Sequence, residues 1–487
     1  MMRRLLLVAW IAACAYAHVG SPDVFLEGSA GPYPMYVTIR PPSVIPGVAE
    51  IEIRCASQDI RAIHVTPTPL TGAAAKFAPT PDAMQRSKAD AQFFTGTLWM
   101  MEPGSWQVRI EADGAKGAGQ LSVPVPAVAT RAKPMQFALG VTLFVMMTVL
   151  AVGLVSIVGA GVREGQLEPG MQAATRSKRR ARVLMGATAI LVILILWAGD
   201  RWWTAEASEF AGGLYRPLQM TASIVNASTA AHDNTSTAAH DNTSTAPHDR
   251  LVLTLANPAW SVPRKIDDFL PDHGHLMHLY MIRQPDAARV WHLHPEMTAS
   301  GVFTLAVPPI PAGQYQLYGD VVHRDGLAET MVASLTVPQD LAGNPIGGDD
   351  AAGVRGESPD GARIVWDRDQ TPLKAREAGI FKFRLVDRNG APVQDAELFM
   401  GMLGHAAFVK NDGTAFAHVH PSGSVPMAAL ALANPAQGDD HSMHHMSGLP
   451  PEADFPYGFP TPGDYRVIVQ MKHGGVIETG IFDAKVD

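Results

Sequence analysis

The amino-acid sequence predicts a mostly β protein made of three immunoglobulin-like β-sandwich modules and two transmembrane helices. Three observations carry this prediction. Two long apolar runs lie near the middle of the chain, alternating apolar and polar residues occur before and after them, and one set of glycine, proline and histidine positions occurs twice. A chain of 487 residues is long enough for two to four domains, so several modules are expected.

The first predicted element is a signal peptide at residues 1–17. Two arginines precede a short apolar run that ends in small residues, which is the pattern of a secretory signal. Cleavage after Ala17 would leave His18 at the mature N-terminus. The residues before Cys14 also resemble a bacterial lipobox, in which Cys14 would carry the lipid. The sequence leaves both N-termini open.

A β-sandwich is predicted next, at residues 18–134. Apolar and polar residues alternate at 36–39 with the period of two that a half-buried strand shows. Cys55 is the cysteine that remains after signal cleavage, so no intramolecular disulfide is expected and a buried structural role is favoured.

Two apolar runs, residues 135–162 and 183–199, predict transmembrane helices. Each is close to the ~20 residues that a helix needs to cross ~30 Å of hydrocarbon. The loop between them, residues 163–182, is rich in lysine and arginine, so the positive-inside rule predicts that it is cytoplasmic. Both large flanking segments are then expected on the periplasmic side of a bacterial inner membrane.

The region after the second run contains an internal duplication. Residues 311–330 and 461–479 share a proline before Gly-x-Tyr, a histidine eight residues after that tyrosine, and a Glu-Thr pair. Upstream, a Gly-His pair leads to His-x-His-Pro in both copies, which indicates repeated domains. The predicted parts are a first repeat at 210–338 with a flexible insert at 228–249, a linker at 339–358, and a second repeat at 359–487.

The histidines of the repeats are candidate metal ligands. Residues two apart in a strand point to one face, so each His-x-His pair presents two imidazoles side by side. Imidazole suits copper, zinc or nickel, and the thioether of nearby methionines favours Cu(I), so copper is the first choice. The candidates are His275, His278, His292, His294 and His323 in the first repeat, His405, His418, His420 and His473 in the second, and His441, Met443, His444, His445 and Met446 in a Met/His loop.

A structural role for the same residues is a competing interpretation. The duplicated spacings also fit a buried hydrogen-bond network in which Glu329 and Glu478 fix neighbouring imidazoles. Methionines such as Met277, Met281 and Met471 are also ordinary core residues.

The duplicated Gly-His, His-x-His-Pro and Gly-x-Tyr features, after a sandwich and two spans, resemble a group of bacterial membrane proteins. The extracytoplasmic modules of that group are similar to YtkA-like and FixH-like domains and, more distantly, to CopC-like copper carriers. CopC-like carriers begin their mature chain with a histidine, which His18 matches, whereas the first module lacks their Met-rich loop. The resemblance implies periplasmic copper trafficking, tolerance or delivery to a respiratory oxidase, with a copper-donating or copper-receiving periplasmic partner.

Two other classes of function compete with a copper carrier. One is a membrane-tethered scaffold whose sandwiches bind protein partners. The other is an oxidative enzyme in which His18 and His64 form a histidine brace around copper. No HExxH, CxxC, phosphate-binding glycine loop or nucleophile elbow occurs, so no enzyme is expected. A formal charge of −8, without long basic stretches outside 163–182, argues against nucleic acid.

Overall fold

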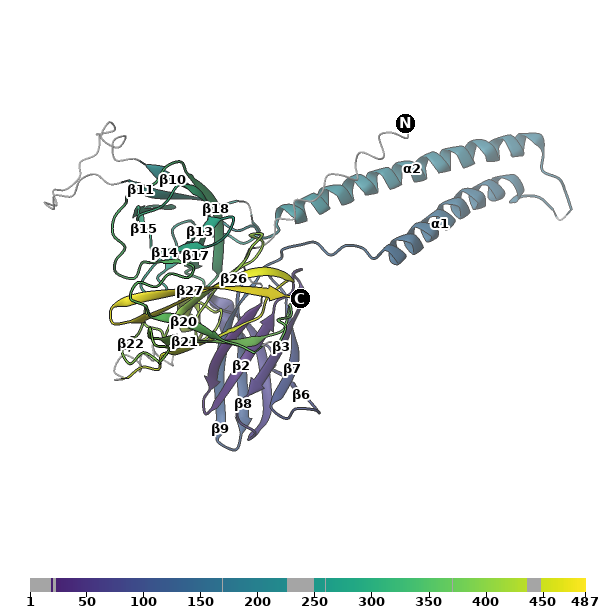
Figure 1. The fold of residues 1–487 in the computed structure, drawn as a ribbon. Coiled ribbons are helices and arrows are strands. Elements are labelled where there is room, and N and C mark those ends of the chain that lie inside the picture. The colour runs from purple at the N-terminus through teal and green to yellow at the C-terminus, as the bar shows by residue number, and fades with distance from the viewer. Residues whose placement is uncertain are drawn as a thin grey trace. The chain divides into compact units, whose positions relative to one another are not determined.

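The computed structural model describes residues 19–20, 23–168, 170–225, 249–258, 260–369, 371–435 and 448–487 (Figure 1). Strands make up 45% and helices 18%, so the prediction of a mostly β protein is confirmed. The predicted signal peptide, nearly all of the 228–249 insert and the whole Met/His loop lie outside the described residues. The chain forms two compact units, Met1–Thr130 with Tyr215–Asp487, and Arg131–Leu214.

The N-terminal module consists of antiparallel strands. They are β1 (Val24–Ala30), β2 (Tyr33–Arg40), β3 (Gly47–Cys55), β4 (Ile60–Pro69), β5 (Asp82–Ala83), β6 (Gln85–Arg86), β7 (Phe93–Met100), β8 (Gly104–Gly114) and β9 (Gly117–Ala127), with a 3-10 turn at Ala73–Lys76. Two sheets result, with the orders β1-β2-β3-β7-β6 and β5-β4-β8-β9. Alternate residues such as Val37 and Ile39 are buried, which gives the module its apolar core. Cys55 is buried and free, as expected for a structural residue.

The first repeat also contains two sheets. Its strands are β10 (Gln219–Val225), β11 (Arg250–Ala256), β12 (Phe269–Leu270), β13 (His278–Gln284), β14 (Arg289–Leu293), β15 (Glu296–Ala299), β16 (Val302–Ala306), β17 (Gly313–His323), β18 (Ala328–Val337) and β19 (Ala351–Val354). The smaller sheet has the order β10-β11-β16-β15, and the larger has the order β12-β17-β13-β14-β19 with β18 on β17. Strand β19 falls within the predicted 339–358 linker, so part of that segment belongs to the first repeat's sheet.

The second repeat has a similar construction. Its elements are β20 (Arg363–Asp367), β21 (Gly379–Val386), β22 (Ala396–Glu397), β23 (His405–Lys410), β24 (Phe416–Val419), α4 (Met427–Ala433), β25 (Glu452–Tyr457), β26 (Gly463–His473) and β27 (Val476–Val486). One sheet has the order β20-β21-β25, and the other has the order β22-β26-β23-β24 with β27 on β26. In both repeats the strand that begins with Gly-x-Tyr pairs with a strand that begins at a histidine, His278 or His405.

An apolar cluster between the two repeats explains why these central strands are buried on both faces. Along β13, Leu279 and Met281 pack into the first repeat's own core, whereas Tyr280 and Ile282 point the other way. Those two side chains join a cluster that contains Phe416 of β24, among other residues of the second repeat. Because side chains alternate along a strand, the even-numbered residues of β13 all face the second repeat.

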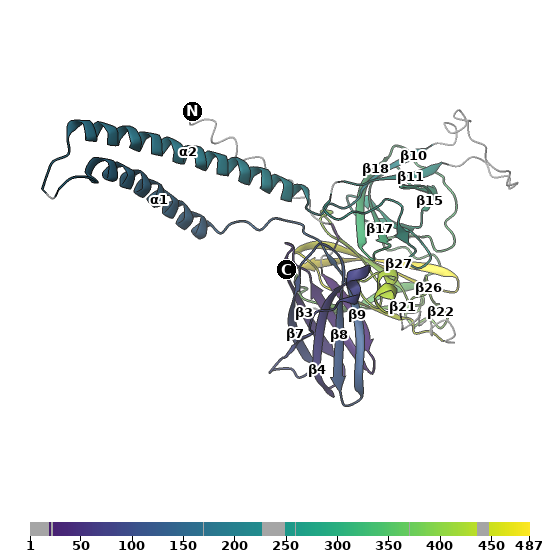
Figure 2. The ribbon, with the colours of Figure 1, turned by 180° about the vertical axis from the view of Figure 1, so that it is seen from behind.

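Helix α4 connects the repeats with the N-terminal module. Asn434, which directly follows the helix, accepts a hydrogen bond from the backbone N–H of Ser122 on β9 (2.9 Å) and donates one to the Ser122 carbonyl (2.8 Å). The reverse view shows α4 beside β9 (Figure 2). At its other end, the Ala428 N–H donates to the Asp272 carboxylate of the first repeat at 2.8 Å. The contacts of α4 therefore fix the turn that carries Asp272.

Two long helices form the second compact unit. They are α1 (Phe137–Glu164) and α2 (Thr175–Gly212). Both are long and apolar enough to cross a membrane, which supports membrane association. At 38 residues, α2 extends about 57 Å, well beyond the predicted span at 183–199, and its extra turns carry the charged residues at either end.

Candidate metal centre

Eight histidines form one continuous cluster where the two repeats meet. Every ring centroid lies within 6.1 Å of at least two others. The members are His273, His275, His278, His292 and His294 from the first repeat and His405, His418 and His420 from the second. The repeats therefore contribute to a single continuous cluster.

The alternation of side chains along the strands explains this convergence. His278 shares its face of β13 with Tyr280, and His418 shares its face of β24 with Phe416, so both face the apolar cluster between the repeats. Tyr280 stacks on His292 with centroids 4.2 Å apart and an interplanar angle of 17°. Tyr280 also meets the His418 ring of the second repeat edge to face, with centroids 5.3 Å apart, so one side chain packs against imidazoles of both repeats.

Three nitrogen atoms converge in the first triad, His278, His292 and His294. The Nδ1 atom of His278 lies 3.2 Å from Nε2 of His292 and 3.2 Å from Nε2 of His294. Nitrogen ligands of a four-coordinate ion with bonds of ~2.0 Å lie about 3.3 Å apart. The triad therefore has the spacing of a three-nitrogen metal site.

The outer nitrogen of each imidazole in the first triad faces an acceptor oxygen. These contacts run from His278 Nε2 to the Asp272 carbonyl (3.0 Å), from His292 Nδ1 to Gln470 Oε1 (2.9 Å) and from His294 Nδ1 to Asp350 Oδ1 (3.0 Å). Each outer N–H donates outward, which leaves the inner nitrogen of a neutral ring with a lone pair. Three lone pairs then face one another, an arrangement that a cation stabilises.

The second triad, His405, His418 and His420, repeats much of this geometry. His405 Nδ1 lies 3.2 Å from His418 Nε2, and His405 Nε2 donates to the Phe399 carbonyl at 3.2 Å. The ligand atoms of all three residues lie within 4.8 Å of one another. Neither ring nitrogen of buried His420 makes a hydrogen bond of good geometry with a described residue, although the Val425 backbone lies close enough to affect its pKa.

Each repeat supplies an oxygen that faces the other repeat's triad. Gln470 of β26 accepts from His292, and Asp320, at the matching register position of β17, lies 3.7 Å from His418 Nδ1. Burial raises the pKa of Asp320 to about 7. Oxygen partners of this kind orient metal-binding imidazoles.

Burial keeps the triad histidines neutral. Burial, with a smaller contribution from neighbouring imidazoles, lowers the pKa of His278 to about 4 and that of His420 to about 3. The same causes hold the pKa of His292, His405 and His418 well below the usual range. Neutral imidazole is the form that binds metal, so the triads are ready to bind at neutral pH.

A matching turn in each repeat contributes differently to the cluster. Asp272 bridges to His275 as Phe399 bridges to Met402, and the second residue of each turn, His273 or Met400, has φ 51°. The His273 ring lies 4.8 Å from His420 and 5.1 Å from His405, against the second triad. The sequence prediction missed His273, although its place in Asp-His-Gly-His was a usable signal.

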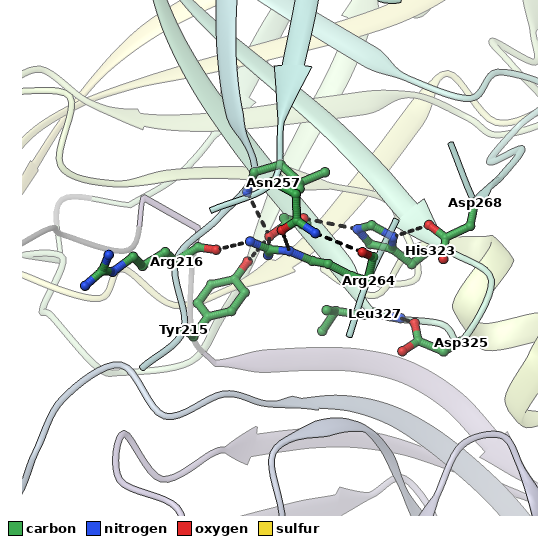
Figure 3. Close-up of polar contacts among 10 residues, drawn as sticks. Tyr215, Arg216, Asn257, Arg264, Asp268, His323, Asp325 and Leu327 are labelled. Atoms are coloured by element: carbon green, nitrogen blue, oxygen red, sulfur yellow. Dashed lines mark hydrogen bonds and ion pairs between the residues drawn. The ribbon is translucent and has the colours of Figure 1, made fainter. Parts of the chain in front are cut away.

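Of the three other predicted histidine ligands, His275 belongs to the cluster and the remaining two lie apart from it. His275 is half-buried and stacks on His294 with ring centroids 4.0 Å apart. His323 instead bonds Asp268 and Glu329 in a buried ionic network (Figure 3). His473 groups with Asp360 and Glu478, and no described contact joins it or His323 to the triads.

The remaining candidates fall into two sets. Met277 and Met281 pack in the first repeat's core and Met471 in the second's, so these three thioethers serve as core residues. The loop candidates lie outside the described residues; they are His441, Met443, His444, His445 and Met446.

The fold and the site define a mostly β protein with two potential membrane helices and a candidate metal centre. Residues 230–339 and 357–487 match the model of a domain of unknown function, DUF8832. Each matched stretch contains one His-x-His-Pro motif. No curated protein matches the sequence.

Several solved structures resemble the chain at low identity. A tetra-tandem repeat in the extending region of a large adhesion protein is 8% identical with a TM-score of 0.17, covering 95% of this chain and 82% of that chain. A 1.5-MDa bacterial ice-binding adhesin is 6% identical with a TM-score of 0.15, covering 91% of each chain. An ICAM-5 D1-D4 ectodomain fragment is 9% identical with a TM-score of 0.16, covering 93% and 77%. Scores this low carry no argument about function.

Proposed function

We propose that this chain is a membrane-anchored metal-binding protein that holds copper between its two repeats. The observation that supports the proposal is the first triad, where the inner nitrogens of His292 and His294 each lie 3.2 Å from that of His278 and each ring is oriented by an outer acceptor. A buried hydrogen-bond network, the competing interpretation, needs no such convergence of imidazole nitrogens. The proposal involves no catalytic step.

The all-imidazole ligand set supports the choice of copper. Imidazole suits copper, zinc and nickel, whereas magnesium and calcium require oxygen ligands. Among divalent ions of the first row, Cu(II) binds most tightly to a given nitrogen site. No methionine sulfur is required for this preference, which therefore does not depend on the Met/His loop.

The two triads suggest two ions. Ring contacts join them directly, since His278 and His418 have centroids 5.1 Å apart and those of His292 and His418 are 5.5 Å apart. Each triad contains three potential ligands, and His273 adds a fourth beside the second. We therefore expect two copper ions per chain, close together.

The burial of the ligands bears on copper delivery. All six triad side chains are buried, so an ion enters or leaves only when the repeats separate or a turn moves. We propose that the exchange partner is a periplasmic copper donor or acceptor and that the Met/His loop at 441–446 is its contact. Trafficking, tolerance and supply to a respiratory oxidase are the roles this fits.

The proposal includes a location and a family relationship. We propose that both large segments lie on the periplasmic side of a bacterial inner membrane, because the loop between α1 and α2 is rich in arginine and lysine. We also propose that the three β modules are immunoglobulin-like and related to YtkA-like, FixH-like and, distantly, CopC-like domains. Their antiparallel sheets and repeated Pro-Gly-aromatic strands support this.

Metal titration of the full chain tests the proposal. Metal-free protein in detergent would be titrated with Cu(I), Cu(II) and Zn(II) in competition with chromophoric chelators. We expect two copper equivalents bound more tightly than micromolar, about 8 kcal/mol, and stepwise loss of these in H292N and H418N. His64 of β4 lies outside the cluster, so H64N is the matched control. Binding weaker than micromolar in the wild type would contradict the proposal.

A further inference from the structure

A buried carboxylate on β18 of the first repeat is neutralised by an arginine. Glu329 has a fully buried side chain and forms an ion pair with Arg264, whose own side chain is 4% exposed (Figure 3). The Tyr215 hydroxyl and the Leu218 N–H donate to the same carboxylate at 2.7 and 3.1 Å. His323 approaches its other oxygen at 3.1 Å. Every charge in this network has an opposite partner.

The second repeat has the same histidine and glutamate without the arginine. His473 follows Tyr465 by eight residues, as His323 follows Tyr315. In the strand register, Glu478 lies opposite Met471 as Glu329 lies opposite Val321, the equivalent position. The contacts around Glu478 are therefore directly comparable with those around Glu329.

The group around Glu478 is acidic. The ligand atoms of Asp360, His473 and Glu478 lie within 4.8 Å of one another. His473 Nε2 lies 3.4 Å from Asp360 Oδ2, and His473 Nδ1 lies 3.5 Å from Asp395 Oδ1. Asp395 is thus placed to hold the outer nitrogen and to leave Nε2 facing the carboxylates.

Apart from their contacts with the Asp360 carboxyl group, two polar atoms in this group are buried without a hydrogen-bond partner among the described residues. They are Nε2 of His473 and Oε1 of Glu478, in residues 7% and 2% exposed. Burial, and secondarily Asp360, raises the pKa of Glu478 to about 7, which shows how unfavourable its charge is here. A buried unpaired acceptor is costly and calls for a partner.

No described basic side chain supplies that partner. Arg388 donates to the Asp360 backbone carbonyl at 3.3 Å, and Lys472 pairs with Glu397 at 3.5 Å. In the second repeat, therefore, no described arginine or lysine balances the carboxylates beside His473, whereas in the first repeat the Arg264 guanidinium balances Glu329.

We propose that a divalent cation binds between Asp360, His473 and Glu478, at the position that corresponds to the Arg264 guanidinium in the first repeat. One imidazole and two carboxylates form a mixed nitrogen and oxygen set that suits a zinc-like ion better than calcium or copper(I). This site is separate from the two triads, and it does not depend on the proposed copper centre.

Zinc counting on the full chain in detergent tests this site. Metal-free protein would be dialysed against micromolar Zn(II) and its bound metal measured. We expect E478Q, and independently D360N at the more exposed carboxylate, to lose one zinc equivalent each. E397Q is the matched control, because Glu397 is a neighbouring acid outside the group, and it should keep the wild-type count. Millimolar Ca(II) should not displace the ion.

The outcome is decisive in both directions. If E478Q and D360N both bind as much zinc as the wild type, the two carboxyl groups share a proton and the proposal fails. Circular dichroism identifies a variant that has simply unfolded, and D360N then decides the result. H292N and H418N should reduce only the zinc held by the triads, so failure of the copper centre is distinguishable from failure of this site.

Discussion

His292 Nδ1 donates to Gln470 Oε1 over 2.9 Å, and this hydrogen bond joins a ligand of the first repeat to a strand of the second. In the opposite direction Asp320 lies 3.7 Å from His418 Nδ1, which is longer than a hydrogen bond. The second repeat therefore orients an imidazole of the first, and metal affinity should depend on a residue that never touches the ion.

Replacing Gln470 tests this dependence. Q470L removes the acceptor that fixes the His292 tautomer, so we expect copper affinity at the first triad to fall about 10- to 100-fold. Competition titration measures the effect. Gln316 of β17 bonds the Ala333 carbonyl of its own repeat, so Q316L is the control that should leave affinity unchanged. Equal affinities for Q470L and the wild type would show that the ring needs no such support.

His273 should act on the second triad alone. Because its ring lies beside His405 and His420, H273F should keep the packing and remove one ligand. We expect one of two copper equivalents to weaken at least about tenfold, with the other unchanged. Stepwise titration in an H292N background isolates the second triad. A loss confined to the first triad would contradict the assignment.

The unfolding free energy of the metal-free protein should fall on acidification from pH 6.5 to 5. The six triad histidines have folded pKa values below the ordinary 6.5, so the unfolded chain binds more protons in this range. Groups with raised folded pKa values oppose this and make the fall smaller than six histidines alone would give; they are Asp320 and Glu478, with values of about 7, and Asp23, Glu27, His323 and Asp350. Each net proton contributes about 1.4 kcal/mol per pH unit.

Urea unfolding at both pH values, with chelator present, measures this change. Saturating copper serves as the comparison, because bound metal stabilises the folded state at both pH values. A metal-free protein whose stability stays constant or rises on acidification would rule out six neutral buried imidazoles.

Arg264 should matter more for stability than an exposed arginine. R264M leaves Glu329 buried without its cation, and breaking a buried pair from one side costs about 3–5 kcal/mol. Arg355 pairs with Asp483 at the surface, with side chains 42% and 53% exposed, so R355M should cost no more than about 1 kcal/mol. Chemical denaturation of both variants gives the comparison. Similar losses would mean that Glu329 simply takes up a proton.

Parts of the site follow from sequence periodicity. His292 and His418 lie on β14 and β24, whereas His294 and His420 directly follow these strands, and the ligand atoms of each triad lie within 4.8 Å of one another. The parity of the strands also separates the remaining candidates. Even-numbered Gln470 faces the other repeat, whereas odd-numbered His473 lies on the same side as Val469 and Met471, in its own repeat's core. On β17 the same alternation places odd-numbered His323 on the opposite side from Asp320, away from the triads.

Other parts of the site did not follow from the sequence. Apolar residues on both faces of β13 and β24 show that these strands are covered on both sides, but not which partner covers them. His273 lies in a turn with positive φ, where neither strand nor helix periodicity predicts the direction of a side chain. Periodicity therefore predicts the direction of side chains on strands and gives no direction for side chains in turns.

The matching turns that carry His273 and Met400 have a consequence for how the centre assembles. In a symmetric homodimer of one repeat, both halves of the cluster would be identical, and the centre would dissociate on dilution. A tandem chain holds both halves at a high effective concentration, whatever the amount of protein. It also permits the halves to differ, with histidine at 273 and 275 where the second turn has methionine, so neighbouring ions can be held at unequal redox potentials within one polypeptide.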